Sequence, residues 1–484
     1  MTPRTRRQCA LPTFTPCWLD TAARPMRWCP HPLRGPVVAH LPQISGCNVA
    51  NVTPAALHVI VEGRLVGVVT QSPRTNQLAF AYDAAWRDAD GAFPVSLSMP
   101  LAGGAYGDAP IRLYLDGLLP DREEVRRRIA QDHHIAHDDA FGLLGVLGED
   151  CPGAVQFLRA ERVPLPEPHE PAVTWLTEHE LAARLRLLRL PGAPARFDTD
   201  AGYFSLAGAQ PKIALLRDDG RWGIPGGRTP TTHIIKPPLG GRIGFVVAEH
   251  VALVLTRELD LVAAESFVLR AEDEIALAVV RYDRVNDSPQ SGLAGWRRVH
   301  QEDLCQALGL PPSRKYETQG APGVAQIVAF LWERSAAAAE DVGRFLDMIV
   351  LNWIMVGTDA HARNYSVLIG SGGEARLAPF YDVASVLGCV ARTKLPAAKL
   401  AMRIGGELAA LTIGRSHWDD QARQMHMDPV ALGERVLALA RRVPDAVQAA
   451  CARVLSTDDL PSADVERLVA RIAARARQCV REFE

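Results

Sequence analysis

The chain has 484 residues, of which 48% are apolar and 22% are charged, and its formal net charge is −2. This length allows about two to four domains with an ample core. The nearly balanced charge excludes an overall basic field that would draw the chain to nucleic acid, so any DNA contact would need a local patch or a partner.

No stretch of about 18 uncharged apolar residues occurs, so no transmembrane helix is expected. The first residues lack the charged and then apolar pattern of a secretory signal. The nine cysteines are scattered and form no C-x-x-C pair. This pattern argues against a disulfide framework or a structural zinc site, and it predicts a cytoplasmic protein.

Residues 1–52 are rich in Pro and Arg and contain a single acidic residue, Asp20. They show no sustained periodicity, so we interpret them as a disordered extension. A basic tail that touches nucleic acid is the alternative interpretation.

Residues 53–160 are predicted to form a small α+β subdomain. The segment "LHVIVEGRLVGVVTQ" alternates around Glu62-Gly63 and predicts a hairpin. The segments "LAFAYDAAW" and "PVSLSMPL" are further strand candidates, whereas "REEVRRRIAQDH" and "DDAFGLLGVLG" are typical of helices.

Residues 161–199 are predicted to be a Pro-rich linker followed by a short helix. In that helix Thr177 and Glu180 have the spacing of a capping box. Residues 200–317 then contain several strand candidates, among them "TTHIIKPP", "ESFVLR" and "IALAVVRYDR", and a helix over about 245–259.

Residues 318–484 are predicted to be mostly helical. The segment "FLDMIVLNWIMVG" is apolar nearly all round, which predicts a buried helix that ends at Gly357. The segment "YSVLIGSGGEARLAPFYD" predicts a hairpin with strands over 365–369 and 375–380.

The loop between the buried helix and this hairpin contains Asp359, His361 and Asn364, and the hairpin ends at Asp382. Phosphoryl transfer needs a carboxylate that accepts the proton of the attacking hydroxyl, and oxygen ligands that hold Mg²⁺ against a triphosphate. The i, i+5 spacing of Asp359 and Asn364 equals that of the protein-kinase catalytic loop. Two alternatives are open: the polar residues could simply cap backbone groups, or Asp359 and His361 could be metal ligands of a hydrolase.

The preceding half offers residues for the nucleotide. Lys236 ends a β-branched strand, and Glu249 on the following helix could orient it. The segment "SLAGAQPK" (205–212) offers a turn whose N–H groups could face phosphates, and "VVRYDR" (279–284) could be a hinge beside adenine. Each of these assignments has an ordinary alternative. Lys236 and the segment 279–284 could be solvated strand ends, Glu249 could be a glutamate on a helix surface, and the segment 205–212 could be a simple turn.

Several stretches together resemble the HipA family of bacterial toxin kinases. They are "GLLPDREEVRRRIA", "LGEDCPGAVQF", "SLAGAQPKIALL", "TPTTHIIKPPLG", "RYDR", "VHQEDLCQALG", "KYETQGAPG", "TDAHARNYSVLI" and "LAPFYDVAS". The resemblance runs from about residue 55 to 480. It implies an α+β, two-lobed protein-kinase-like fold, with a β-rich N-lobe, an added N-terminal α+β subdomain and an all-α C-lobe.

The resemblance also implies a serine/threonine protein kinase that uses ATP and Mg²⁺. It makes Asp359 the catalytic base, Asn364 and Asp382 the Mg²⁺ ligands, and Ser205 the autophosphorylation site. The implied ATP contacts are Ala207, Gly208, Ala209, Gln210, Pro211, Lys212, Lys236, Val280, Arg281, Tyr282, His361, Ala362, Arg363, Asn364, Tyr381, Asp382, Val383 and Ala384.

The implied role is the toxin of a type II toxin–antitoxin pair, which inactivates itself by autophosphorylation. The implied partners are a HipB-like helix-turn-helix antitoxin, operator DNA reached through that antitoxin, and a protein substrate, a translation component such as glutamyl-tRNA synthetase. Residues 404–420 are less basic than expected for direct DNA contact.

Two alternative functions are a small-molecule kinase of the aminoglycoside-phosphotransferase type and a non-catalytic corepressor bound to an antitoxin.

Overall fold

The computed structural model describes residues 55–163, 173–190, 205, 208, 210–227, 229–287, 292–293 and 295–484. The predicted extension over residues 1–52 lies outside this part of the chain, as do most of the Pro-rich linker and Ala207 and Ala209 of the expected phosphate loop.

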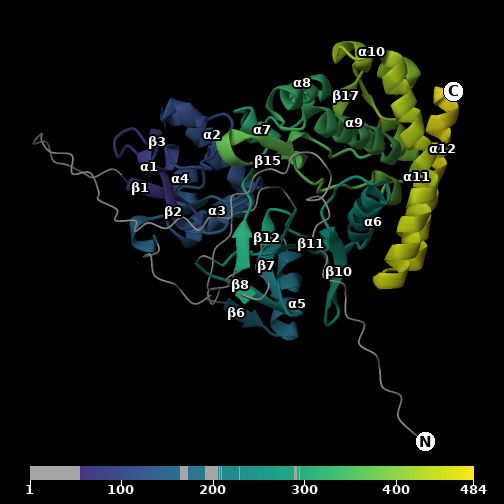
Figure 1. Cartoon of the computed structure of the whole chain (residues 1–484). Helices are drawn as coiled ribbons and strands as arrows, with labels where there is room; N and C mark the ends of the chain where they lie inside the picture. Colours follow the sequence, from purple (N-terminus) through teal and green to yellow (C-terminus); the bar gives the residue numbers. More distant parts are fainter. Residues whose placement is uncertain are drawn as a thin grey trace, which may run out of the picture. The chain divides into compact units, whose positions relative to one another are not determined.

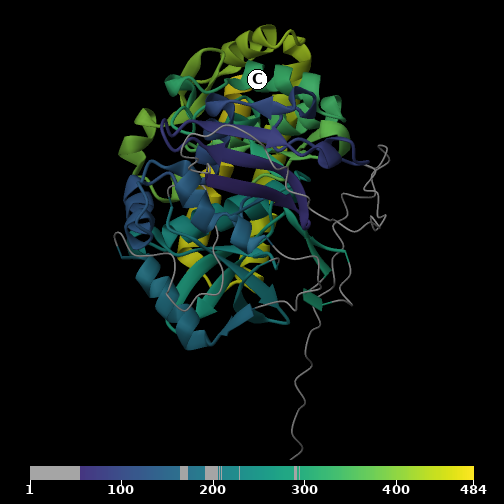
Figure 2. The same ribbon diagram turned by 90° about the vertical axis from the view of Figure 1, so that its left-hand side faces the viewer.

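The predicted N-terminal subdomain contains an antiparallel sheet with the strand order β4-β3-β2-β1-β5. The strands are β1 (Ala55–Val61), β2 (Arg64–Gln71), β3 (Leu78–Tyr82), β4 (Ala105–Tyr106) and β5 (Gln156–Leu158). Figure 2 shows the purple strands of this sheet side by side. Glu62 and Gly63 have φ angles of 48° and 76°, so the predicted hairpin is confirmed, with a turn that suits the twist of its strands.

The helices of this subdomain are α1 (Ala84–Arg87), α2 (Asp108–Leu118), α3 (Glu123–Asp132) and α4 (Ala140–Leu147). Side chains of α2 and α4, including Ile111, Leu115 and Phe141, share one buried cluster with the sheet residues Val59 and Phe80. The sheet therefore has one face covered by helices, as is usual for an α+β unit.

The predicted strand over residues 94–101 is wrong. Only an isolated bridge between Ser96 and Met99 forms there. Side chains from elsewhere take the place of a strand ladder: the Tyr82 hydroxyl accepts from the amide of Val95 at 2.8 Å and donates to the carbonyl of Met99 at 2.6 Å. Alternating apolar residues therefore line the core without pairing as a strand.

A second antiparallel sheet has the order β10-β11-β9-β7-β8-β6. Its strands are β6 (Val173–Leu176), β7 (Ile213–Asp218), β8 (Arg221–Pro225), β9 (His233–Lys236), β10 (Ser266–Ala271) and β11 (Glu274–Val280). Along β11, Ala276 and Ala278 join the cluster that contains α5 (Glu178–Leu188), whereas Leu277 and Val279 join the cluster that contains α6 (Gly244–Glu258). This alternation puts one helix on each face of the sheet. The capping box at Thr177 is confirmed.

The second half is largely helical. Its helices are α7 (Leu304–Ala307), α8 (Val324–Arg334), α9 (Ala338–Met355), α10 (Arg415–Gln424), α11 (Pro429–Thr457) and α12 (Ser462–Phe483). The last two lie side by side (Figure 1). Small sheets interrupt this half, with strands β12 (Arg284–Asn286), β13 (Trp296–Arg298), β14 (Gln301–Asp303), β15 (Ser366–Ile369), β16 (Ala375–Leu377), β17 (Lys399–Ile404) and β18 (Glu407–Ala409). The hairpin predicted after Asn364 is confirmed as β15 and β16.

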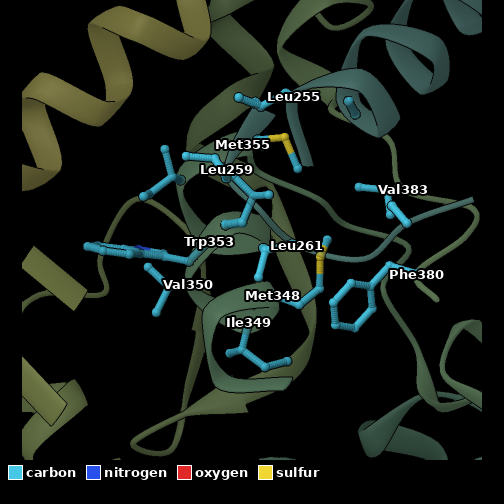
Figure 3. Close-up of a cluster of buried hydrophobic side chains, with 14 of the residues drawn as sticks. Leu255, Leu259, Leu261, Met348, Ile349, Val350, Trp353, Met355, Phe380 and Val383 are labelled. Atoms are coloured by element: carbon cyan, nitrogen blue, oxygen red, sulfur yellow. The ribbon is translucent and has the colours of Figure 1, made fainter. Parts of the chain in front are cut away.

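The buried core of this half connects three elements that carry polar residues of interest. Figure 3 shows Trp353 and Met355 of α9 in the same cluster as Leu255 of α6, Phe380 and Val383. Helix α6 contains Glu249, α9 leads into the Asp359 loop, and Phe380 lies two residues before Asp382. Close packing of one core therefore fixes the distances among these three elements.

Helix α9 ends differently from the prediction. Its C-cap is Val356 in the left-handed conformation, with φ 55°, and not a glycine. A Cβ on Gly357 would lie 2.4 Å from Oδ1 of Asn352. The glycine is therefore needed for close approach, while the buried Val356 takes the unfavourable backbone conformation.

Candidate active site

A cavity of about 410 Å³ is lined by residues from the N-terminal subdomain, the second sheet and the helical half. Most of the residues selected from the sequence lie on its wall. They are Gly208, Gln210, Lys212, Lys236, Glu249, Val280, Arg281, Tyr282, Asp359, His361, Arg363, Asn364, Tyr381, Asp382 and Ala384. The folded chain thus brings together side chains that are up to 176 positions apart in the printed sequence.

Lys236 is the centre of a buried ion-pair cluster in this cavity. Its Nζ atom lies 2.6 Å from Oε1 of Glu249 and also contacts the carboxylate of Asp382. The Lys236 side chain is 5% exposed, so a lone charge there would be costly. Burial opposes the charged form, but Asp382 and Glu249 outweigh it and hold the pKa of Lys236 above its usual value. The lysine is therefore a fixed cation in the wall.

The two carboxylates around Lys236 differ from each other. Burial would raise the pKa of Asp382, but Lys236 and then Lys212 hold it below its usual value. For Glu249 the burial effect is larger than the attraction of Lys236, so its pKa is raised. Asp382 is therefore the carboxylate that stays ionised most firmly, and its side chain is 33% exposed.

Asp359 lies at the open part of the cavity, with 69% of its side chain exposed. Its main-chain carbonyl accepts from the amide nitrogen of His361 at 2.8 Å and from Nδ2 of Asn364 at 2.7 Å. The hydroxyl of Tyr316 donates to its carboxylate. The loop is therefore held by its backbone, while the Asp359 carboxylate faces solvent and could accept a proton.

His361 is not hydrogen-bonded to the carboxylate of Asp359, because Nε2 lies 3.9 Å from Oδ1. Burial lowers the pKa of His361, and the nearby Asp359 charge only partly offsets this. The imidazole is thus neutral at pH 7, and its ring packs edge-on against Tyr316.

Asn364 and Asp382 fit a divalent cation by their chemistry. The amide nitrogen of Asn364 is used by the Asp359 carbonyl, so its amide oxygen is the atom that could face a cation. One amide oxygen and one carboxylate are hard ligands of the kind that Mg²⁺ prefers, with substrate phosphates and water completing the shell. Among the residues that the structure describes, no cluster of three or more His, Cys, Asp or Glu side chains could hold a metal alone.

The described part of the expected phosphate loop also faces the cavity. Gly208 has a φ of 107°, and a Cβ there would approach Nζ of Lys212 to 2.6 Å. Burial lowers the pKa of Lys212, an effect that Asp382 partly opposes. The backbone angle of Gly208 is one that only glycine adopts readily, so the angle is the reason for a glycine at this position.

The expected hinge lies on the wall, but the side chain of Arg281 points elsewhere. Its backbone amide donates to the carbonyl of Thr232 at 2.9 Å. Its guanidinium is buried against Asp150 and Asp283, at 3.2 and 2.9 Å. Arg281 therefore lines the cavity while its charge is used in a structural ion-pair network.

Four other predicted residues do not line the cavity. Ala362 and Val383 are buried in the core, and Pro211 is not part of the wall. Ser205 is fully buried: its hydroxyl donates to the carbonyl of Leu118 at 2.7 Å and its amide to the carbonyl of Asp150 at 3.0 Å.

Sequence reasoning assigned no role to several residues of this wall. Asp121, Asp303 and Lys315 line the cavity, and Tyr316 contacts Asp359. Asp121 lies within the quoted "GLLPD" stretch, and Lys315 and Tyr316 begin "KYETQGAPG". Those stretches contributed to the resemblance to the family. Their contacts with the site could not be predicted, because these contacts join elements that are distant in sequence.

Comparison with known proteins identifies two matched regions. The profile of the HipA-like C-terminal domain matches residues 204–454, and that of the HipA N-terminal domain matches residues 57–158. The chain is 34% identical to the protein Y4mE of Sinorhizobium fredii, over 88% of this chain and 98% of that protein. It is 26% identical to the serine/threonine-protein kinase toxin HipA of Shewanella oneidensis, over 66% of this chain and 73% of that protein.

A solved structure has the same fold. It is the Shewanella oneidensis MR-1 toxin–antitoxin complex of HipA, HipB and operator DNA, and the match has a TM-score of 0.75 at 22% identity, over 88% of this chain and 98% of that one. The described helices include none that is long and apolar enough to cross a membrane. The structural match shows that the chain has the two-lobed, kinase-like α+β fold that the resemblance implied.

Proposed function

The chain belongs to the HipA family, and on that premise we propose that it is an ATP- and Mg²⁺-dependent serine/threonine protein kinase that acts as the toxin of a type II toxin–antitoxin pair. One observation carries this proposal: Lys236, Glu249, Asp359, Asn364 and Asp382 converge on one cavity although they come from four separate parts of the chain. These are the residue types that phosphoryl transfer requires.

Each residue has a role that its surroundings support. Lys236, held by Glu249, binds the phosphates of ATP, and Asn364 and Asp382 would hold Mg²⁺, which neutralises phosphate charge. Asp359 accepts the proton of the attacking hydroxyl. The hydroxyl oxygen then bonds to the γ-phosphorus, the bond from that phosphorus to the bridging oxygen breaks, and ADP leaves.

The partners follow from the family. The Shewanella oneidensis HipA chain was solved together with HipB and operator DNA, so we propose a HipB-like antitoxin for this chain, with DNA reached through it. For the substrate we propose a translation component such as glutamyl-tRNA synthetase, and for the location the cytoplasm.

Self-inactivation at Ser205 completes the proposal. Because Ser205 is fully buried, phosphorylation requires its segment to leave the position described here. A phosphate carries about two negative charges, which could not return to the site between the carbonyls of Leu118 and Asp150 without a large desolvation cost. We expect Ser205→Ala to transfer phosphate to substrate but to keep its activity during incubation with ATP, whereas wild type loses it; continued self-labelling of the variant would move the modified site elsewhere.

The direct test compares wild type with Asp359→Asn, which keeps the side-chain shape but removes the base. We expect transfer of the γ-phosphate of ATP to protein to fall by about 10²–10⁴-fold, with the Kd for Mg²⁺–ATP nearly unchanged by calorimetry. Equal transfer rates in the two proteins would contradict the assignment of the base.

Two further measurements separate the alternative functions. Label that appears on an aminoglycoside-like small molecule, and on no protein, would favour a small-molecule kinase. Growth arrest that persists when Asp359→Asn is expressed would favour a non-catalytic corepressor.

A further inference from the structure

The segment over residues 117–121, "GLLPD", comprises the last two residues of helix α2 and the first three residues of the connection to helix α3. It contacts two loops of the candidate active site that are themselves far apart in sequence. We refer to this segment as the 117–121 brace.

The brace binds the phosphate loop through its backbone and through Asp121. The amide of Asp121 donates to the carbonyl of Gly208 at 3.2 Å, and the amide of Gly208 donates back to Oδ1 of Asp121 at 3.3 Å. Pro120 and Gly208 form a parallel bridge, and the carbonyl of Leu118 accepts from the Ser205 hydroxyl at 2.7 Å. The phosphate loop is therefore bonded to the brace at two positions.

The brace also binds the loop that contains Asp359, His361 and Asn364, which we refer to as the catalytic loop. The guanidinium of Arg363 donates to the carboxylate of Asp121, and its Nη2 atom donates to the carbonyl of Gly117 at 2.6 Å. Nζ of Lys315 lies 2.9 Å from Oδ2 of Asp121. The amide of Ala362 donates to the carbonyl of Lys315 at 3.1 Å, so this second cation is also tied to the loop that contains Asn364.

The contacts are shielded from water and the carboxylate is charged. The Asp121 and Arg363 side chains are 16% and 4% exposed. Burial would raise the pKa of Asp121, but Arg363 and Lys315 outweigh it and lower the pKa to about 2. Charge-assisted hydrogen bonds of this kind are roughly twice as strong as neutral ones.

We propose that Asp121 is a positioning residue for phosphoryl transfer, which holds the phosphate loop and the catalytic loop in a fixed relation. This inference rests on the proposed function. One carboxylate accepts from Gly208, which faces the nucleotide side, and from Arg363, whose neighbour Asn364 faces the metal side. The N-terminal subdomain is then a working part of the kinase site, because it supplies the group that aligns the γ-phosphate with the base.

The experiment compares Asp121→Asn with the matched control Asp116→Asn. Asp116 lies on the preceding helix and pairs with Arg126 at 3.2 Å, within the subdomain. A misalignment of about 1 Å can cost about 10²-fold in rate, so we expect Asp121→Asn to lower kcat by about 10- to 100-fold with a smaller change in KM for ATP. Amide hydrogen exchange should become faster in both the 208–214 and the 360–366 segments. The control should match wild type in each respect.

Lys315→Gln provides a second variant if Asp121→Asn fails to fold. It removes one cation and leaves the Arg363 pair, so we expect a smaller loss of kcat and faster exchange in the 360–366 segment. The proposal is overturned if neither variant changes kcat or exchange, or if Asp116→Asn changes them equally. If wild type transfers no phosphate at all, the proposed function fails, and the exchange comparison still decides whether Asp121 holds the two loops.

Discussion

At the scale of single residues, burial gives similar carboxylates different states. The Asp382 side chain is partly exposed and contacts Lys236, so its pKa is lowered. Glu302 on β14 is 1% exposed, and its Oε1 atom accepts from the amide of Leu97 at 2.8 Å. Burial outweighs this hydrogen bond and raises the pKa of Glu302 to about 8. Glu302 is therefore protonated in the folded chain at neutral pH.

This state of Glu302 predicts a pH dependence of stability. Between its ordinary pKa of 4.5 and the folded value of about 8, the folded chain binds a proton that the unfolded chain releases. Stability is thus lost as pH rises, by at most about 1.4 kcal/mol for each pH unit. The Glu302→Gln side chain cannot ionise, so the variant should lack this loss. The free energy of unfolding of the variant minus that of wild type, both measured in urea, should therefore increase from pH 5 to pH 8.

The comparison of variant with wild type removes the effect of the neighbouring His300. Burial lowers the pKa of His300 from its ordinary value of 6.5 to about 4. Its contribution to stability is therefore lost as pH falls below 6.5, whereas that of Glu302 is lost as pH rises. The contribution of His300 is present in both proteins and cancels. A difference between them that is constant from pH 5 to pH 8 would show that Glu302 is ionised in the folded state.

At the scale of elements, the end of helix α9 sets the start of the loop that contains Asp359. Val356 takes a left-handed backbone conformation that is unfavourable for a β-branched residue. The amide of Gly357 donates to the carbonyl of Asn352 at 2.7 Å, and Ser385 donates to the carbonyl of Met355 at 2.5 Å. The surrounding core therefore holds a turn that the local sequence disfavours, and this turn directs Asp359 toward the cavity.

Gly357→Ala tests this turn. The added Cβ would meet Oδ1 of Asn352 at 2.4 Å, so we expect a loss of about 1–3 kcal/mol of stability and a larger fall in kcat than in ATP affinity. Gly107→Ala is the matched control, because its Cβ would meet nothing within 4 Å and its φ is −81°. Thermal unfolding and phosphoryl transfer should be measured on both variants. Equal stability and equal kcat in the two variants would show that a glycine is not required at position 357.

At the scale of the whole molecule, a buried ion-pair network joins the N-terminal subdomain to the expected hinge. Asp150 contacts Arg281, Arg284 and Arg298 at 3.2, 2.9 and 3.2 Å, and it is 4% exposed. Burial would raise the pKa of Asp150, but the three guanidinium groups hold it well below its usual value. Together with the 117–121 brace, this network ties the subdomain to the lobes at two places.

Asp150→Ala should therefore be severe. It leaves buried guanidinium groups without one of their carboxylates, which typically costs about 3–5 kcal/mol. Denaturant unfolding measures the loss. The surface pair of Arg441 and Glu484, with side chains 57% and 51% exposed, supplies the control: Glu484→Gln should change stability by less than about 1 kcal/mol. A loss from Asp150→Ala as small as that of the control would mean that the network does not join the parts.

The sequence by itself determined most elements and the residue types of the site. The hairpin at Glu62-Gly63, the capping box at Thr177 and the hairpin after Asn364 are encoded by local patterns, because turn and cap preferences act over a few residues. The spacing of Asp359 and Asn364 is likewise local. The strand predicted over 94–101 failed because its backbone bonds go to Tyr82 and Glu302, which pattern alone does not reveal.

Only the tertiary structure decided which of these residues meet. It placed Ala362 and Val383 in the core, turned the guanidinium of Arg281 away from the cavity, and brought Asp121 between two loops that lie 87 and 242 residues away along the chain. Contacts of this kind depend on how helices and sheets pack, and packing is set by the shape of the whole core. For that reason the chemistry could be inferred from short motifs, whereas the contribution of the N-terminal subdomain to the site could not.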